Sequence, residues 1–435
     1  MNRLSTTIIC LFLFISGMHC QELLTLDQAI HIGLTNNYGI RISQNQVQAA
    51  KNNATPGQAG ILPEIGANAG YVKSWNDARL KVVTGSELDT QLAPADLLTA
   101  GVGLTWTLFD GGNMFITYDK LRKLEEASDL GARITLENTI ARVIAAYYEI
   151  VRQEQISLML EEQVAISRFR ADLARTRWEA GTGSEIDYLK GKVELNADLS
   201  RLSNQKTLAE NAKTHLNDLL ARDVNTVFRV ADSIPANDEL DYLTLVTALQ
   251  HDNSSLRLAR KTRQLGELDA RSAAAGLWPR LDYHAGMNYY RSETDAHFIQ
   301  YNRYYGPTMG LTLNVNLFDG LNQRRRYRNA LLSLDSDDLQ LKQAENRLTS
   351  SLMQTYNDYR NQLELIGFEQ ENLLLAQRNI DLARESYGIG SISSLQLREV
   401  QEDLLNAQAR LINARYLARI TETELLLLAG LLVKE

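Results

Sequence analysis

Two short stretches of this 435-residue chain decide its fold, Leu108-Phe109-Asp110-Gly111 and Leu317-Phe318-Asp319-Gly320. They lie 209 positions apart, and the same separation joins Asp172-Leu173-Ala174-Arg175 to Asp381-Leu382-Ala383-Arg384. No gap interrupts this correspondence across residues 108–221 and 317–430. The period is far longer than that of a solenoid repeat, which is roughly 20–50 residues. The chain is therefore predicted to be a duplicated half-protein.

Composition narrows the function classes. The chain has 45 basic and 53 acidic residues, a net charge of −8, which argues against a protein that binds nucleic-acid phosphates. Its two cysteines, Cys10 and Cys20, both fall in the first 20 residues, which excludes a cysteine-ligated metal centre or a disulfide framework. The histidines are scattered without metal-ligand spacing, and no phosphate-binding loop occurs. We therefore expect no enzyme, no cofactor and no metal.

The first 20 residues predict export. Arg3 supplies a positive charge, and residues 6–15 form an apolar segment that is too short to span a bilayer. Residues 1–20 are therefore predicted to be a signal peptide. Cleavage after Cys20 is favoured over lipidation of Cys20, because a lipoprotein signal has small residues before its cysteine and His19 is not small.

Each half contains two segments with strand periodicity, within residues 63–110 and 279–319. In 102–106, for example, Val102, Leu104 and Trp106 alternate with glycine and threonine. One such strand alone fits a soluble sheet packed on a helix. Four in an exported chain are typical of strands with one face to lipid and one to water. Loops are expected at 74–98 and 291–306. The residues predicted to face the membrane are Val102, Leu104, Trp106, Tyr283, Met287, Tyr289, Leu311 and Leu313.

Four strands cannot close a membrane barrel. An open sheet edge in hydrocarbon leaves backbone amides unsatisfied, at several kcal/mol each. The smallest membrane barrels have about eight strands. Copies of the chain must therefore contribute jointly to one barrel, and the strand count alone does not choose between two copies and three.

Most of the remaining length shows a seven-residue apolar repeat, typical of coiled coils. One row is Leu352, Tyr359, Ile366, Leu373, Ile380 and Tyr387, and the next helix has Leu397, Leu404, Leu411, Ala418 and Leu425. Residues 113–180 and 322–387 would each form a helix about 100 Å long. The expected organisation is an N-terminal helix at 21–62, strands at 63–110, a helical hairpin at 111–225, a linker with a helix at 226–278, strands at 279–319 and a second hairpin at 320–435.

The turns between paired helices run from Trp178 to Asp187 and from Tyr387 to Leu395. Glycine supplies the positive φ that ends a helix, and Ser184 or Ser393 can cap the next one. Ordinary helical-hairpin turns explain these residues. Two such turns at one end of a duplicated structure would nevertheless form a tip, where loops contact partners.

In the order and spacing of these features, the chain resembles the TolC-like outer-membrane factors of Gram-negative bacteria. The resemblance implies a mainly α fold with transmembrane β: a homotrimer whose 12-stranded outer-membrane β-barrel continues into a 12-helix periplasmic α-barrel. It implies the exit duct of a tripartite efflux pump or type I secretion system. The implied partners are a periplasmic adaptor (membrane fusion) protein, outer-membrane lipid and an inner-membrane pump of resistance-nodulation-division, ABC or major facilitator type. The cargo stays open among drugs, metal ions and proteins.

The resemblance also implies roles at the turns. Tyr387 corresponds to a gate tyrosine and Asp187 to the aspartate that it bonds in the closed state. Gln396 and Glu399 fall where the family narrows its pore with acidic rings, and Ile392 replaces the arginine of the closing salt bridge. A looser or differently latched gate is therefore our hypothesis. The implied adaptor contacts are Trp178, Gly181, Thr182, Gly183, Ser184, Gly388, Gly390, Ser391 and Ser393.

A second interpretation is a secreted or periplasmic coiled-coil scaffold or adaptor, with the strands in a soluble domain. Such an adaptor would carry one helical hairpin rather than two. The symmetric insertion of strand pairs in both halves therefore favours the duct.

Overall fold

The computed structural model describes residues 22–231, 233–235, 240–295 and 298–433. The predicted signal peptide and Cys20 lie outside these residues. The chain divides into two compact units. One, here named the hairpin unit, takes its residues from Met1–Asn37, Thr139–Glu239 and Asn357–Glu424. The other, the sheet unit, takes them from Tyr38–Asn138, Leu240–Tyr356 and Leu425–Glu435.

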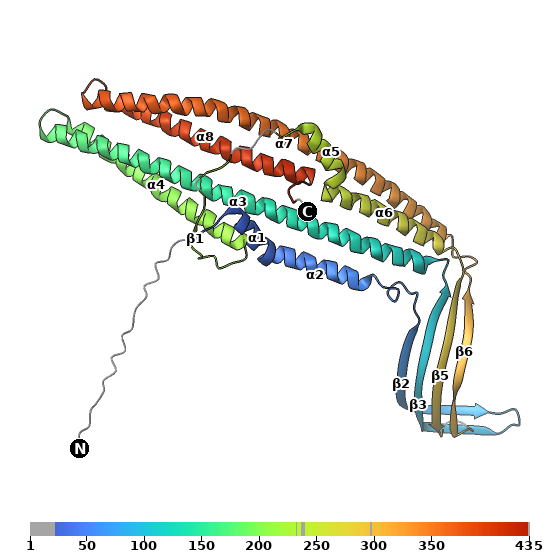
Figure 1. Cartoon of the computed structure of the whole chain (residues 1–435). Helices are drawn as coiled ribbons and strands as arrows, with labels where there is room; N and C mark the ends of the chain where they lie inside the picture. Colours follow the sequence, from blue (N-terminus) through green and yellow to red (C-terminus); the bar gives the residue numbers. More distant parts are fainter. Residues whose placement is uncertain (1–21, 232, 236–239, 296–297, 434–435) are drawn as a thin grey trace, which may run out of the picture. The chain divides into compact units, whose positions relative to one another are not determined.

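The hairpin unit contains two pairs of long helices (Figure 1). The C-terminal part of α3 (Asn113–Glu179) pairs with α4 (Glu185–Leu219), and that of α7 (Asn322–Gly388) with α8 (Ser394–Ala429). The short helix α1 (Leu26–Asn36) also belongs to this unit. The sequence did not predict the parallel pair formed by β1 (Glu22–Leu23) and β4 (Phe228–Arg229).

The seven-residue rows are buried as predicted. In α7, Tyr359 is 1% exposed and Ile380 is fully buried, and in α8 every member of the row is buried. A repeat of 3.5 residues keeps one stripe of a helix against its neighbour along its whole length. In α4 the corresponding row is only half-buried at Tyr188, Leu195 and Leu202.

The sheet unit holds a four-stranded antiparallel sheet in the order β2-β3-β5-β6. Its two edges are β2 and β6 (Figure 1). The strands are β2 (Glu64–Lys81), β3 (Glu87–Phe109), β5 (Arg280–Thr294) and β6 (Tyr301–Asn314), and the helices that lie wholly in this unit are α2 (Tyr38–Asn53), α5 (Tyr242–Asp252) and α6 (Ser254–Ala275).

The predicted loops at 74–98 and 291–306 are wrong, because strands occupy most of both segments. Strand β2 continues to Lys81 and β3 already begins at Glu87. Cross-strand ion pairs, Arg79 with Asp89 at 2.6 Å and Lys81 with Glu87 at 2.5 Å, support this extension. The register shifts between the pairs Asn76–Ala93 and Ala78–Thr90, so β3 has one extra residue there, and this interrupts its alternation and hid the strand in the sequence. At the other end, β6 stops at Asn314, so Val315 and Leu317 lie beyond it.

Strand register places all eight predicted membrane-facing residues on one face of the sheet, here named the apolar face. Val102 lies opposite Met287, and Tyr283 lies between Trp106 and Leu311. Most of these side chains are exposed, Leu311 by 64%. The other face carries glycine, asparagine and threonine, as in the row of Gly66, Gly103 and Gly286. A sheet with one exposed apolar face needs an apolar medium or partner to cover it.

The Leu-Phe-Asp-Gly motifs start the long helices. The first motif overlaps the end of β3, and the second follows the end of β6. Asp110 accepts a hydrogen bond from the Met114 N–H at 3.2 Å, and Asp319 accepts one from the Gln323 N–H at 2.8 Å. The following glycines, Gly111 and Gly320, have φ values of 72° and 69°. Only glycine adopts this backbone freely. The motif therefore caps the start of the long helix that follows it in both halves.

In the part of the chain that the structure describes, no helix is both long enough and apolar enough to cross a membrane.

Candidate functional site

Both hairpin turns end their first helix in the same way. Gly181 has φ +71°, and the Thr182 N–H donates to the Arg177 carbonyl at 2.9 Å. Gly390 has φ +82°, and the Ser391 N–H donates to the Ser386 carbonyl at 2.8 Å. This six-to-one bond around a left-handed glycine is the Schellman motif, which satisfies the last carbonyls of a helix. The predicted role of both turn glycines in ending the helices is confirmed.

The turns differ in how they start the second helix. The Ser184 hydroxyl accepts a hydrogen bond from the Ile186 N–H at 3.1 Å. The Ser393 hydroxyl accepts from the Gln396 N–H at 3.3 Å, and the Gln396 side-chain carbonyl accepts from the Ser393 N–H at 2.9 Å. This reciprocal pair is a capping box. Gln396, which the resemblance places at the pore, therefore uses its side chain to start α8.

Tyr387 lies in an apolar cluster rather than on the surface. It is 4% exposed, and the cluster also contains the buried residues Ile380, Ala383, Leu397 and Leu404. Ile392, at the position of the family's arginine, packs against this cluster. The turn after α7 therefore contains a small core of its own.

Arg177 connects the end of α3 to the end of α7. Its guanidinium donates to the carbonyl oxygens of Tyr387 at 2.9 Å and Gly388 at 3.3 Å. The same group lies 5.1 Å from the centre of the Tyr387 ring. A cation is favourable both at the negative end of a helix and over an aromatic ring. Arg177 thus joins the two hairpins through backbone groups.

Asp187 and Tyr387 line the same cavity, of about 210 Å³, together with Arg177 and Ile392. Among the described residues, no hydrogen bond joins the Tyr387 hydroxyl to the Asp187 carboxylate. The contact predicted for a closed pore therefore stays a prediction. Glu399 is exposed on α8, as a residue that lines an assembly pore would be in a single chain.

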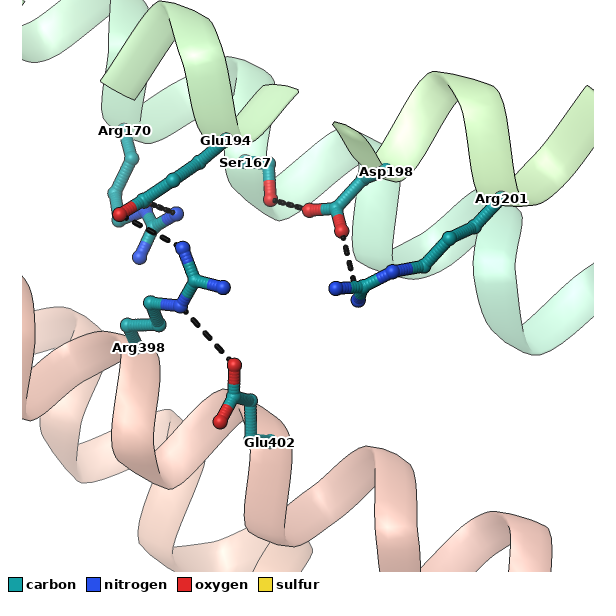
Figure 2. Close-up of polar contacts among 7 residues, drawn as sticks. All are labelled: Ser167, Arg170, Glu194, Asp198, Arg201, Arg398 and Glu402. Carbon is teal, nitrogen blue, oxygen red and sulfur yellow. Dashed lines mark hydrogen bonds and ion pairs between the residues drawn. The ribbon is translucent and has the colours of Figure 1, made fainter. Parts of the chain in front are cut away.

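A second connection between the hairpins is ionic (Figure 2). The Glu194 carboxylate on α4 forms ion pairs with Arg170 of α3 at 2.5 Å and with Arg398 of α8 at 2.7 Å. Arg398 also pairs with Glu402 at 3.0 Å. The bond to Glu194 raises the pKa of the Arg398 guanidinium. Because Glu194 belongs to one hairpin and Arg398 to the other, this ion pair holds the two together.

The Arg170 side chain is only 4% exposed, so its charge is almost fully removed from water. Its Nε and Nη1 atoms are buried and donate to no described protein atom. Glu194 is thus the carboxylate that compensates a buried cation. Breaking such a pair is expensive, because it leaves the remaining charge without a partner.

Sequence reasoning missed Arg177, Glu194 and Arg398. In the duplicated alignment, Arg177 corresponds to Ser386 and Arg398 to Leu189. For the two arginines, a charge present in only one half was therefore the available signal, whereas Glu194 has a carboxylate counterpart in Asp403. That signal could not be interpreted without knowing which helices lie side by side.

The remaining turn residues present an accessible surface. Trp178 is 38% exposed and stacks on Tyr188, with the ring centres 5.5 Å apart. The Thr182 hydroxyl donates to the Arg177 carbonyl at 3.1 Å. A side chain at Gly183 would come within 2.8 Å of the Arg177 Cβ, whereas one at Gly388 would meet open space. Within the described residues, no group of three or more His, Cys, Asp and Glu side chains could hold a metal ion.

In a comparison with known protein families, residues 29–222 and 245–431 match the family described as "Outer membrane efflux protein". The chain belongs to the outer membrane efflux protein family. It is 21% identical to the outer membrane protein TolC of Vibrio cholerae, over 85% of this chain and 82% of TolC. It is 21% identical to the proteases secretion protein PrtF of Dickeya chrysanthemi, over 95% of this chain and 89% of PrtF.

The fold matches that of a solved channel. The CmeC outer membrane channel of Campylobacter jejuni superposes with a TM-score of 0.79 at 14% identity, over 93% of this chain and 85% of CmeC. The chain is therefore an efflux protein of the Gram-negative outer membrane, with the fold of an outer-membrane channel, and it extends into the periplasm.

Proposed function

We propose that three copies of this chain form one outer-membrane exit duct for a tripartite efflux pump or a type I secretion system. The observation that carries the proposal is the sheet, which has one exposed apolar face and two edges with no further strand in the described chain. In hydrocarbon those edges must find partners. Edge β6 of one copy pairs with β2 of the next, and three copies then contribute twelve strands. The two halves of the chain act as a duplicated unit within this ring.

The long helices support the same assembly. A second apolar row with seven-residue spacing is exposed on α7, at Phe368 by 63%, Leu375 by 60% and Leu382 by 57%, and Ile389, 83% exposed, continues the spacing just after the helix ends. Such a row is a coiled-coil seam without its partner helix. A helix of the neighbouring copy covers it, so that the helices of three copies enclose a periplasmic tunnel.

The hairpin turns form the periplasmic gate. Glu399 contributes one acidic ring at the closed mouth, and Tyr387 and Asp187 approach each other there in the closed assembly. The exposed turn residues around Trp178 and Gly388 contact a periplasmic adaptor, which opens the mouth for an inner-membrane pump. The relatives include a proteases secretion protein, PrtF, and a pyoverdine export protein, OpmQ of Pseudomonas aeruginosa, so both efflux and type I secretion fit.

The latch of this gate differs from the one that the resemblance implies. Ile392 packs into the apolar cluster and brings no charge to the mouth. The connection between the hairpins instead uses Arg398 on Glu194 and Arg177 on the α7 carbonyls. Opening moves the second hairpin away from the first and breaks these contacts.

Native mass and location test the assembly. Full-length protein is extracted with mild detergent from fractionated envelopes and measured by native mass spectrometry. A trimer in the outer-membrane fraction is the expected result. A soluble periplasmic monomer would overturn the duct and would favour the coiled-coil scaffold.

Conductance in planar bilayers tests the latch. Arg398→Gln is expected to raise the open probability, because it removes the ion pair between hairpins. Arg410→Gln is the matched control, since Arg410 on α8 pairs with Glu369 on α7 of the same hairpin at 2.8 Å. An equal open probability in both variants would reject the Arg398–Glu194 latch.

A further inference from the structure

Two arginines face each other at the end of the sheet farthest from the long helices. Arg291 on β5 lies directly opposite Arg303 on β6. Both share the apolar face, two positions beyond the facing pair Tyr289 and Tyr305. Like charges directly opposite on one face of a sheet repel each other. An arrangement of this kind calls for a compensating anion.

Within the residues that the structure describes, an ion pair compensates Arg291 but not Arg303. Arg291 pairs with Glu293 at 2.5 Å and lies 5.9 Å from the centre of the Tyr301 ring. Arg303 makes no ion pair or side-chain hydrogen bond with any residue that the structure describes, and it is exposed. Its guanidinium is therefore available to an external ligand.

The apolar face next to Arg303 is hollowed. A groove of about 690 Å³ is lined mostly by residues of this face, Ala100, Val102, Met287, Tyr289, Arg303 and Tyr305, and also by Asn68, Gly101 and Asn288. The small side chain of Ala100 leaves space that the larger residues around it border. Such a groove has the composition to hold a hydrocarbon chain, with a cation at one end.

The distance from the start of the apolar rows to the arginine pair matches the thickness of the apolar part of the membrane. From Leu313 to Tyr305 the apolar face of β6 spans eight residues, about 27 Å along the strand. A tilt of about 40° reduces this to ~21 Å across the membrane, close to the apolar band of about 25 Å in outer-membrane barrels. The next row, Arg303 with Arg291, thus falls at the level of lipid headgroups.

We propose that this site binds one phosphorylated glycolipid of the outer leaflet. An acyl chain lies in the groove, and a phosphate monoester lies between Arg303 and Arg291. Arginine binds phosphate through two parallel N–H donors, and a dianionic phosphate removes the repulsion between the two guanidiniums. The inference rests on the proposed function, because it requires the apolar face to contact outer-membrane lipid.

The neighbouring copy in the proposed trimer does not supply the missing anion. Strand β2, which pairs with β6 across the interface, has carboxylates only at Glu64 and Asp77. Glu64 lies at the opposite end of the apolar rows, and Asp77 already accepts the Leu92 N–H at 2.6 Å. Between these two carboxylates along β2 lies Lys73, which adds a further positive charge.

The test uses the full chain, extracted and freed of lipid in detergent, with purified bisphosphorylated lipid A as the probe. Native mass spectrometry is expected to show about one lipid per chain, with about tenfold weaker binding for Arg303→Gln. Arg303→Lys should recover part of the loss. Arg79→Gln is the matched control, because Arg79 lies on the same sheet and pairs with Asp89 beyond the apolar rows. It should bind like the wild type.

Two further measurements separate a lipid from a free anion. Dephosphorylated lipid A should bind as weakly to the wild type as lipid A does to Arg303→Gln. Ala100→Phe, which fills the groove, should weaken lipid A binding and leave the weak binding of inorganic phosphate unchanged. Unchanged binding in Arg303→Gln, or equal binding of both lipids, would overturn the proposal.

The native mass and membrane location of each sample show whether the lipid site alone or the proposed duct is wrong. An outer-membrane trimer whose lipid binding ignores Arg303 rejects the lipid site alone. A chain that is neither trimeric nor in the outer membrane rejects the proposed function, and the lipid site with it.

Discussion

The two helical hairpins have nearly the same length and end their first helices in the same way, but they differ in how much of the apolar row on their second helix they cover. In α8 the row from Leu397 to Leu425 is buried throughout. In α4 the equivalent row is half-buried at Tyr188, Leu195 and Leu202, and neighbouring apolar residues such as Val193 are 68% exposed. The second hairpin thus covers its α8 row within one chain, whereas the first leaves part of its α4 row to further contacts.

This difference assigns separate roles to the two hairpins. The second has a buried cluster at its turn and a capping box, and both stiffen that end of the hairpin. The first holds the carboxylate, Glu194, that the second hairpin binds through Arg398. In the proposed gate, the second hairpin would be the rigid part and its contact with Glu194 the one that breaks.

The largest expected effect comes from removing Glu194. Glu194→Ala leaves the Arg170 charge buried without a carboxylate and should cost about 3–5 kcal/mol of unfolding free energy. Glu402→Ala is the control, because Glu402 is 49% exposed and its loss should cost below about 1 kcal/mol. Thermal unfolding of the solubilised protein, followed by far-ultraviolet circular dichroism, measures both. Similar costs would show that Arg170 does not depend on Glu194.

Substituting one leucine in each row sharpens the comparison between the hairpins. Leu404 is 6% exposed and Leu195, its equivalent in the first hairpin, is half-buried. Leu404→Ala should cost about 2–5 kcal/mol through the lost burial and the cavity. Leu195→Ala should cost about half as much, since its side chain is only partly removed from water. Equal costs in the solubilised assembly would mean that a neighbouring copy buries Leu195.

The repeats and periodicities of the sequence predicted the strands, the long helices and the buried rows. They succeeded because burial on one face imposes a period of two on a strand and of 3.5 on a helix. The strand ends were wrong where the alternation broke, as at the bulge in β3 opposite Asn76 and Ala78. A bulge shifts the face of every later residue, so period counting stops there.

The candidate site was predicted less completely than the fold. Glycine and serine of the turns were found, because their roles depend on local backbone geometry. Arg177, Glu194 and Arg398 were missed, because an ion pair between helices depends on which side chains meet in space. Gln396 was assigned to the pore by resemblance, yet its spacing of three from Ser393 is also the local signature of a capping box.

The two helix starts offer a smaller test. Ser393→Ala removes a reciprocal cap and should cost about 1–2 kcal/mol, whereas Ser184→Ala, with one bond to the Ile186 N–H, should cost about 0.5–1 kcal/mol. Hydrogen exchange of the first turns of α8 and α4 measures the loss locally. A larger increase in exchange rate in α4 than in α8, each compared with the wild type, would reverse the proposed order of the two costs.

The smallest expected effect concerns acid. Arg410 on α8 bonds to Glu369 on α7 and lowers the pKa of that carboxyl, and the first hairpin has Leu160 at the equivalent position. An unfolded glutamate has a pKa of about 4.3, so this pair stabilises the second hairpin above that pH. The stabilisation disappears as pH falls through the lower pKa of the folded state. Because Arg410 is 53% exposed, the effect should stay below about 1 kcal/mol.

Glu369→Gln should therefore lower the thermal midpoint slightly near pH 7, and the difference from the wild type should vanish near pH ~3. Glu371→Gln, which removes an exposed carboxylate from the same helix, is the control for net charge. The same shift in both variants would assign the effect to overall charge. A shift in Glu369→Gln alone would show that the acid-sensitive contact belongs to the second hairpin. Acid would then loosen the second hairpin and leave the buried Leu160 side chain of the first hairpin unaffected.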